Sequence, residues 1–239
     1  MLIAASVLPV LDLMQGQVVH AVAGRRSQYQ PLTSKWCEHA HDPLKLTRAL
    51  HQRFGFIDYY LADLDALEGK ESQQLSMARL VEQGCQLWLD AGFQSVKTAQ
   101  NYLAHGLKRL IVAGETLSSV SMLRQMTETI FADQLVFSLD LSRGKLRSSP
   151  GVFPSDEPLE VVDCVIETGF RQFIVLDTAD VGVSQGPSTV ALCRQIQQRH
   201  PGCTIISGGG VRNRADIQTL ENAGVERVLV STWLHQGCP

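Results

Sequence analysis

Two aspartates in matching local sequences are the residues best suited to do chemistry. Asp12 and Asp140 each lie at the end of an apolar run, in a Leu-Asp-Leu-x-x-Gly pattern that occurs twice, half a chain apart. The pattern predicts a buried strand with an aspartate near its C-terminal tip and a turn glycine after it. A fully buried, unpaired aspartate is costly, so we expect both carboxylates to face a wet cavity.

Two facing carboxylates in a partly desolvated cavity can hold different pKa values, so that one remains a base while the other is a protonated acid. Such a pair suits removal of a proton from a carbon beside a carbonyl or imine, with delivery of a proton to an oxygen. The alternative is that the two aspartates only cap neighbouring loops. Because the motif is duplicated, we predict a catalytic role for Asp12 and Asp140.

A glycine-rich turn near the C-terminus could bind an anion. Glycines without Cβ let backbone amides approach an anion, and the N-terminus of a following helix adds partial positive charge. In α/β barrels the loops after the seventh and eighth strands frequently bind phosphate. The alternative is a tight turn whose glycines serve only backbone geometry. We predict that the phosphate-binding residues are Ser207, Gly208, Gly209, Gly210, Ser231 and Thr232.

Alternating strand and helix patterns would position these residues. Strands are predicted at residues 8–13, 56–62, 85–89, 109–112, 135–141, 172–176, 203–206 and 227–230. Helices are predicted between them at 43–54, 71–83, 95–105, a segment of about ten residues after 116, 158–168, 188–199 and 213–222. The first helix has a typical start, because Asp42 can serve as its N-cap and Pro43 as its first residue.

The two halves of the chain also repeat each other. Residues 55–63 match residues 169–177, and residues 106–109 match residues 224–227 at a similar offset. Eight strand–helix alternations with a duplicated half predict an α/β fold, a (β/α)8 TIM barrel with an internal two-fold half-barrel repeat. We predict a single domain, 1–239, with half-barrels of about 1–130 and 131–239. A doubly wound open sheet is the alternative. In the barrel, Asp12 and Asp140 lie on strands one and five.

Composition narrows the class of partner. The chain has 239 residues, 44% of them hydrophobic and 19% charged, which argues for a packed core and against disorder. A net charge of −3 offers no basic field for nucleic acid. The N-terminal apolar run lacks basic residues and carries Asp12, so we expect no signal peptide or membrane span and a cytoplasmic protein. The six cysteines have no metal-binding spacing, so we expect packed, reduced thiols and no metal site.

The whole chain resembles the histidine-biosynthesis barrels, the family of the phosphoribosylformimino-aminoimidazole-carboxamide-ribotide isomerase and the cyclase barrel of imidazole glycerol phosphate synthase. The resemblance lies in residues 9–13, 139–141 and 207–211 and in the half-barrel repeat. It implies a metal-independent, cofactor-free Amadori-type isomerisation of a phosphosugar amine from aldose to ketose. By the same resemblance, Asp12 is the base at C2 of the sugar and Asp140 is the acid that opens the ribose ring.

Departures from the family pattern gather at one end of the expected barrel mouth. The family's first phosphate site has glycine-rich turns, but this chain has Asp90 and Glu115 there. Each carboxylate would repel a nearby phosphate by about 1 to 4 kcal/mol. We therefore predict no phosphate at this end, and contacts from Asp90 and Glu115 to a cationic or donor-rich group. Further substrate contacts are predicted from two strand-tip aspartates and from the first mouth loop, namely Asp63, Asp177 and Arg25.

The function predicted from the sequence is an acid/base reaction, favoured as an aldose–ketose isomerisation, on a small phosphorylated molecule with an amino-heterocycle at its other end. One alternative is a paralogue that carries out a different reaction in the biosynthesis of one-carbon carrier cofactors of the pterin or furan type. Another is a barrel that binds a phosphorylated metabolite without turnover or docks on another subunit. We expect no complementation of a strain that lacks the histidine-pathway isomerase.

Overall fold

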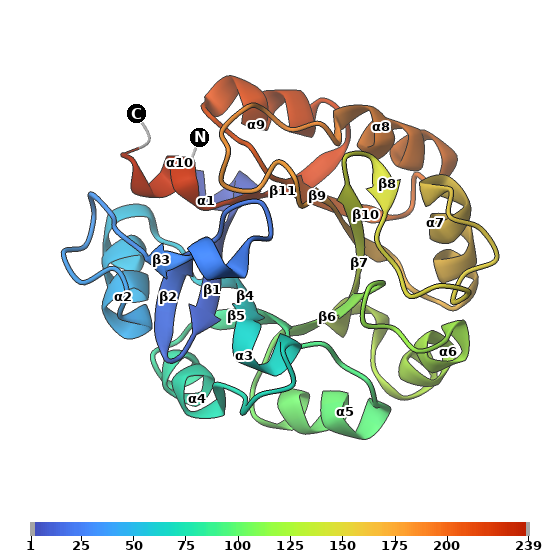
Figure 1. The fold of residues 1–239 in the computed structure, drawn as a ribbon, viewed down its shortest axis with the longest axis horizontal. Helices are drawn as coiled ribbons and strands as arrows, with labels where there is room; N and C mark the ends of the chain where they lie inside the picture. Colours follow the sequence, from blue (N-terminus) through green and yellow to red (C-terminus); the bar gives the residue numbers. More distant parts are fainter. Residues whose placement is uncertain (1–2, 238–239) are drawn as a thin grey trace.

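Eight parallel strands close into a barrel in the computed structural model, which describes residues 3–237 (Figure 1). They are β1 (Val7–Met14), β4 (Asp58–Asp63), β5 (Gln86–Asp90), β6 (Arg109–Ala113), β7 (Leu135–Ser142), β9 (Gln172–Asp177), β10 (Thr204–Gly208) and β11 (Val225–Val230). Each strand pairs in parallel with the next, and β11 pairs with β1, placing Val7 opposite Val228. The predicted TIM barrel is therefore confirmed, and the open-sheet alternative is wrong because the two outer strands of such a sheet would not pair.

Helices surround the strands in Figure 1, and every helix expected from the sequence is present. The longer ones are α2 (Pro43–Phe54), α4 (Gln74–Glu82), α5 (Val96–Ala104), α6 (Val120–Thr129), α7 (Pro158–Glu167), α8 (Val190–Arg199) and α9 (Arg214–Glu221). The short ones are α1 (Ile3–Ser6), α3 (Leu64–Leu67), α10 (Thr232–His235) and the 3-10 helices η1 (Arg26–Gln28) and η2 (Ala132–Gln134). Helix α4 begins later than predicted because Ser72 and Gln73 instead donate hydrogen bonds to Asp63.

Helix α2 begins as its sequence predicts. The Asp42 carboxylate accepts hydrogen bonds from the backbone amides of Leu44 and Lys45, and Pro43 occupies the first turn. We expect Asp42→Ala to lower the free energy of unfolding by about 1 kcal/mol, measured by urea denaturation. Ser119→Ala is the matched control, because Ser119 precedes α6 without making a side-chain cap. Equal effects of the two substitutions would contradict the prediction.

The buried apolar residues form two clusters, one inside the barrel and one between the barrel strands and the surrounding helices. The interior cluster is formed by inward-pointing strand residues such as Leu8, Tyr60, Trp88, Ile174 and Ile206. The larger cluster fills the space between the strands and the helices. The five cysteines within the described ranges carry free thiols, and Cys238 lies outside the described residues. No helix among residues 3–237 is both long enough and apolar enough to cross a membrane.

Two hairpins extend the barrel strands at matching places in the two halves. Strand β1 folds back into β2 (Gln17–His20), which pairs with β3 (Gln30–Pro31), and β7 folds back into β8 (Lys145–Leu146). The loop after β2 contacts the loop after β9, since the Ala23 amide donates to the Val181 carbonyl at 2.8 Å. A Cβ on Gly182 would lie 2.3 Å from the Ala21 carbonyl oxygen, so this contact requires glycine. The first and sixth mouth loops are thereby joined over the barrel.

Candidate active site

A cavity of about 170 Å³ lies at the C-terminal ends of the barrel strands. Asp12, Asp90 and Asp140 line it from β1, β5 and β7, which are the first, third and fifth strands of the barrel. Alternate strands of such a barrel contribute side chains to the same layer. The register agrees with this arrangement, because Ala62 on β4 lies opposite both Asp12 and Asp90. The structure thus brings the two predicted catalytic aspartates together and adds a third carboxylate beside them.

Burial perturbs the acidity of all three aspartates. The pKa of Asp12 is raised from 3.8 to about 7, chiefly by desolvation and next by the negative charge of Asp90. The pKa of Asp140 is also raised to about 7, by desolvation and then by Asp90 and Glu115. Desolvation raises the pKa of Asp90 to about 6. Near neutral pH, Asp12 and Asp140 can therefore supply both a proton donor and a proton acceptor.

The predicted anion site lies at the ends of β10 and β11, across the barrel from Asp90 on β5 and next to β1. Gly209, Gly210, Ser231 and Thr232 all line the cavity, with φ angles of +81° at Gly209 and +68° at Gly210. These left-handed conformations favour glycine. The hydroxyl of Thr232 lies 3.0 Å from the ring nitrogen Nε2 of His20, which joins β2 to this side of the site.

Ser207 and Gly208, which were predicted to bind phosphate, do not line the cavity. The buried Ser207 hydroxyl donates to the Val175 carbonyl oxygen at 2.7 Å and lies 2.7 Å from the Thr189 hydroxyl. A Cβ on Gly208 would lie 2.4 Å from the Leu229 carbonyl oxygen. Both residues therefore support the packing of β10 under the glycine turn.

Two other predicted contact residues point away from the cavity. Asp63 is opposite Leu13, and Asp177 is opposite Leu141, each one position beyond the layer that holds Asp12 and Asp140. Successive side chains of a strand point to opposite faces, so these two aspartates lie on the helix side of the barrel wall. Asp63 accepts hydrogen bonds from the amides of residues 66 and 73, and Asp177 accepts from the amides of residues 143, 144 and 179. They organise the loops that follow their strands.

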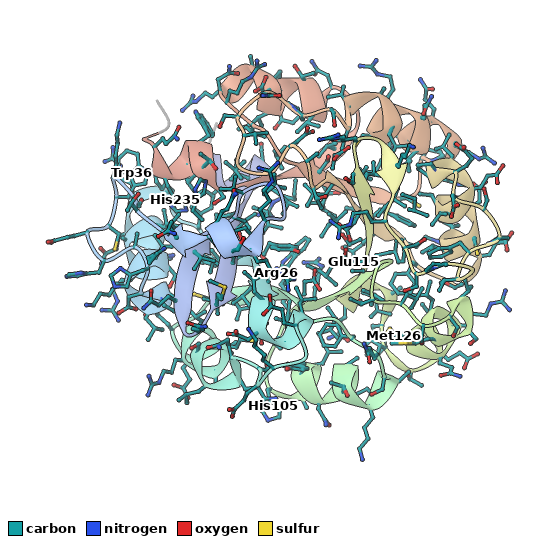
Figure 2. The ribbon with its side chains drawn as sticks, in the orientation of Figure 1. Arg26, Trp36, His105, Glu115, Met126 and His235 are labelled. Atoms are coloured by element: carbon teal, nitrogen blue, oxygen red, sulfur yellow. The ribbon has the colours of Figure 1, made fainter. Side chains whose placement is uncertain are left out.

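Two arginines, Arg26 and Arg147, lie close enough to the cavity for their charges to act on its aspartates. Arg26 pairs with Glu68 at 3.0 Å, and Arg147 pairs with Glu115 at 2.9 Å. Figure 2 shows Arg26 and Glu115 over the barrel opening. The charge of Arg26 lowers the pKa of both Asp12 and Asp90. The neighbouring Arg25, which the sequence indicated, is exposed and lies outside the cavity lining.

Sequence reasoning missed Tyr60 and Arg147. In the sequence, Tyr60 is one of several aromatic residues in apolar strands, and Arg147 lies in a polar loop. Neither residue type indicated a place near the cavity. Phe153, in the loop after β8, packs edge-on against Phe137, with ring centroids 6.0 Å apart. Within residues 3–237, no group of three or more His, Cys, Asp or Glu side chains is arranged to hold a metal ion.

The chain is similar in sequence to a known protein family and to several of its members. The family described as histidine biosynthesis protein matches residues 6–238. A relative from Lacticaseibacillus casei is 28% identical over 225 residues, covering 93% of this chain and 90% of the relative. It is named as an isomerase of an imidazole-4-carboxamide that carries 5-phosphoribosyl and 5-phosphoribosylamino groups. A relative with the same name from Leuconostoc mesenteroides is 23% identical (97% and 94% covered), and an uncharacterized protein of Methanocaldococcus jannaschii is 27% identical (97% and 93% covered).

Proposed function

Since the chain belongs to the histidine biosynthesis protein family, we propose that it is an isomerase that converts a phosphorylated amino sugar from an aldose to a ketose. The observation that carries this proposal is the shared cavity of Asp12 and Asp140, which approach from opposite strands of the barrel. Similar relatives are named as isomerases of a phosphoribosyl compound, which agrees with this reaction class.

In the proposed reaction, Asp140 donates a proton to the ring oxygen of the sugar. The bond between that oxygen and C1 breaks, and C1 forms an iminium with the amine nitrogen. Asp12 removes the proton from C2, giving an enolamine, and, after that proton has exchanged with solvent water, protonates C1. The hydroxyl proton of the enolamine restores Asp140 as C2 becomes a carbonyl. Because hydrogen only moves from C2 to C1, no oxidant or reductant is consumed.

The two sides of the cavity favour a substrate with one phosphate. Gly209, Gly210 and the hydroxyls of Ser231 and Thr232 offer backbone and side-chain donors on one side of the cavity. Asp90 and Glu115 line the other side, where their charges disfavour a second phosphate. We therefore propose that the far end of the substrate carries amine or amide N–H donors, as an amino-heterocycle does.

The proposal is tested by comparing two substrates. One is a phosphoribosylamine with a single phosphate and an amino-heterocycle on nitrogen, and the other is the doubly phosphorylated substrate named for the relatives. We expect kcat/KM to favour the first by roughly tenfold or more, since about 1.4 kcal/mol of repulsion corresponds to one decade. Deuterium incorporation at C1 in heavy water, followed by NMR, reports the proton transfer.

Equal or better turnover of the doubly phosphorylated compound would contradict the single-phosphate proposal. Binding of either compound with neither a ketose product nor deuterium incorporation would contradict the isomerase itself and would favour a barrel that binds a phosphorylated metabolite without turnover.

A further inference from the structure

Tyr60 occupies a central place on the floor of the cavity. It lies on β4 between Val10 on β1 and Trp88 on β5, and it belongs to the interior cluster of the barrel. The next inward position on β4 is Ala62, whose small side chain leaves room for the tyrosine ring to rise toward the cavity. The Tyr60 hydroxyl donates to Oδ2 of Asp90 at 3.2 Å.

The three aspartates of the cavity differ in their hydrogen bonding. Asp90 accepts from the Tyr60 hydroxyl and from the Gly92 amide, the latter at 3.4 Å. Asp140 accepts from the Ser138 hydroxyl at 3.0 Å. Asp12 accepts no hydrogen bond from the described residues. Hydrogen bonds to a carboxylate favour its charged form, so Asp90 is the best prepared of the three to carry a negative charge.

We propose that Tyr60 and Asp90 form a positioning pair, in which Tyr60 fixes Asp90 as a carboxylate and Asp90 acts through Asp12 and Asp140. A fixed charge in the same layer makes it harder for either neighbour to lose its proton. Asp90 thereby keeps the two proton-transfer groups partly protonated at neutral pH. The effect of Asp90 on Asp12 and Asp140 does not depend on the proposed function. Only the use of these two groups for isomerisation rests on it.

The other charges around Asp90 leave this arrangement in place. Burial and the three aspartates raise the pKa of Tyr60 well above 10, so its hydroxyl remains a donor across the neutral range. The charge of Glu115 raises the pKa of Asp90, and Arg26 lowers it, as the two hydrogen bonds to Asp90 also do. The titratable and charged groups that act on Asp90 or its two neighbours are Asp12, Arg26, Tyr29, Tyr60, Glu115, Asp140 and Arg147.

The test is a titration of the protein with carbon-13 in its aspartate carboxyl groups, followed by NMR. In Asp90→Asn, we expect the midpoints of both Asp12 and Asp140 to fall by about one pH unit, because a nearby like charge is gone. In Tyr60→Phe, we expect the Asp90 midpoint to rise, because a donor to its charged form is lost. The matched control is Ser138→Ala, which should raise the midpoint of Asp140 and leave that of Asp12 unchanged.

A stability measurement provides a second readout. Groups whose pKa is raised on folding stabilise the folded state at acidic pH, and this contribution is lost as pH rises through the folded pKa of about 6 to 7. Asp90→Asn should therefore raise the free energy of unfolding more at about pH 8 than at about pH 5.

Unchanged Asp12 and Asp140 midpoints in Asp90→Asn, or an unchanged Asp90 midpoint in Tyr60→Phe, would overturn the proposal. Neither measurement uses a substrate, so a failure here is separate from a failure to find isomerase activity.

Discussion

Replacing Asp12 or Asp140 by asparagine is expected to lower kcat by roughly 10²- to 10⁴-fold, the usual contribution of a positioned acid or base. Asparagine keeps the size of the side chain and its ability to hydrogen-bond, but it cannot donate or accept the transferred proton at neutral pH. The anion site lies on other strands, so the affinity for a phosphorylated ligand should change little. The expected signature is a lost kcat with a nearly unchanged dissociation constant.

Single-turnover kinetics and calorimetric binding of the same ligand would measure the two quantities separately. Asp163→Asn is a suitable control, because Asp163 lies on α7, where it pairs with Arg199 and His200. If kcat in either active-site variant stays within the range of this control, the roles given to Asp12 and Asp140 fail.

The two variants should also differ in their remaining chemistry. With Asp12→Asn, the ring-opening acid is intact, so exchange of the C2 proton with solvent should be lost while ring opening continues. With Asp140→Asn, ring opening itself should become slow, and proton exchange should fall as a consequence. The same loss of both steps in both variants would argue against separate roles for the two carboxylates.

The sequence predicted the barrel because its strands, turn glycines and repeat all follow from local pattern. Asp12 and Asp140 were recognisable because a polar residue within an apolar strand needs an explanation, and the duplication supplied one. Asp63 and Asp177 form an equally symmetric pair in the sequence, yet they face the helices. Strands buried on both faces have no polar alternation, so the sequence alone does not reveal which way a strand-end side chain points.

Only some of the residues predicted for the anion site line the cavity, for a related reason. The run of three glycines signals close backbone approach, but only the structure separates Gly208, which packs against β11, from Gly209 and Gly210, which line the cavity. The hydrogen bond between Tyr60 and Asp90 joins two strands and depends on barrel closure and register. No local pattern contains that information.

Gly210 gives the sharpest test of the anion site. Its φ of +68° strains any other residue, and a Cβ there would lie 2.6 Å from the carbonyl oxygen of Gly186. The Gly186 amide in turn donates to the Gly210 carbonyl at 2.9 Å, so the two loops cannot separate without losing this bond. We expect Gly210→Val to weaken binding of inorganic phosphate by roughly tenfold or more, since about 1.4 kcal/mol of strain corresponds to one decade.

Calorimetric titration with phosphate measures this loss, and Gly202→Ala is the matched control because a Cβ at Gly202 would meet no atom within 4 Å. Should Gly210→Val fold poorly, Thr232→Val removes one hydroxyl donor without touching the backbone and should weaken binding in the same direction. If phosphate binding is unchanged in both variants, the anion binds elsewhere in the barrel. Asp12 and Asp140 would then face a substrate held from a different side, and the proposed direction of proton transfer along the sugar would have to be abandoned.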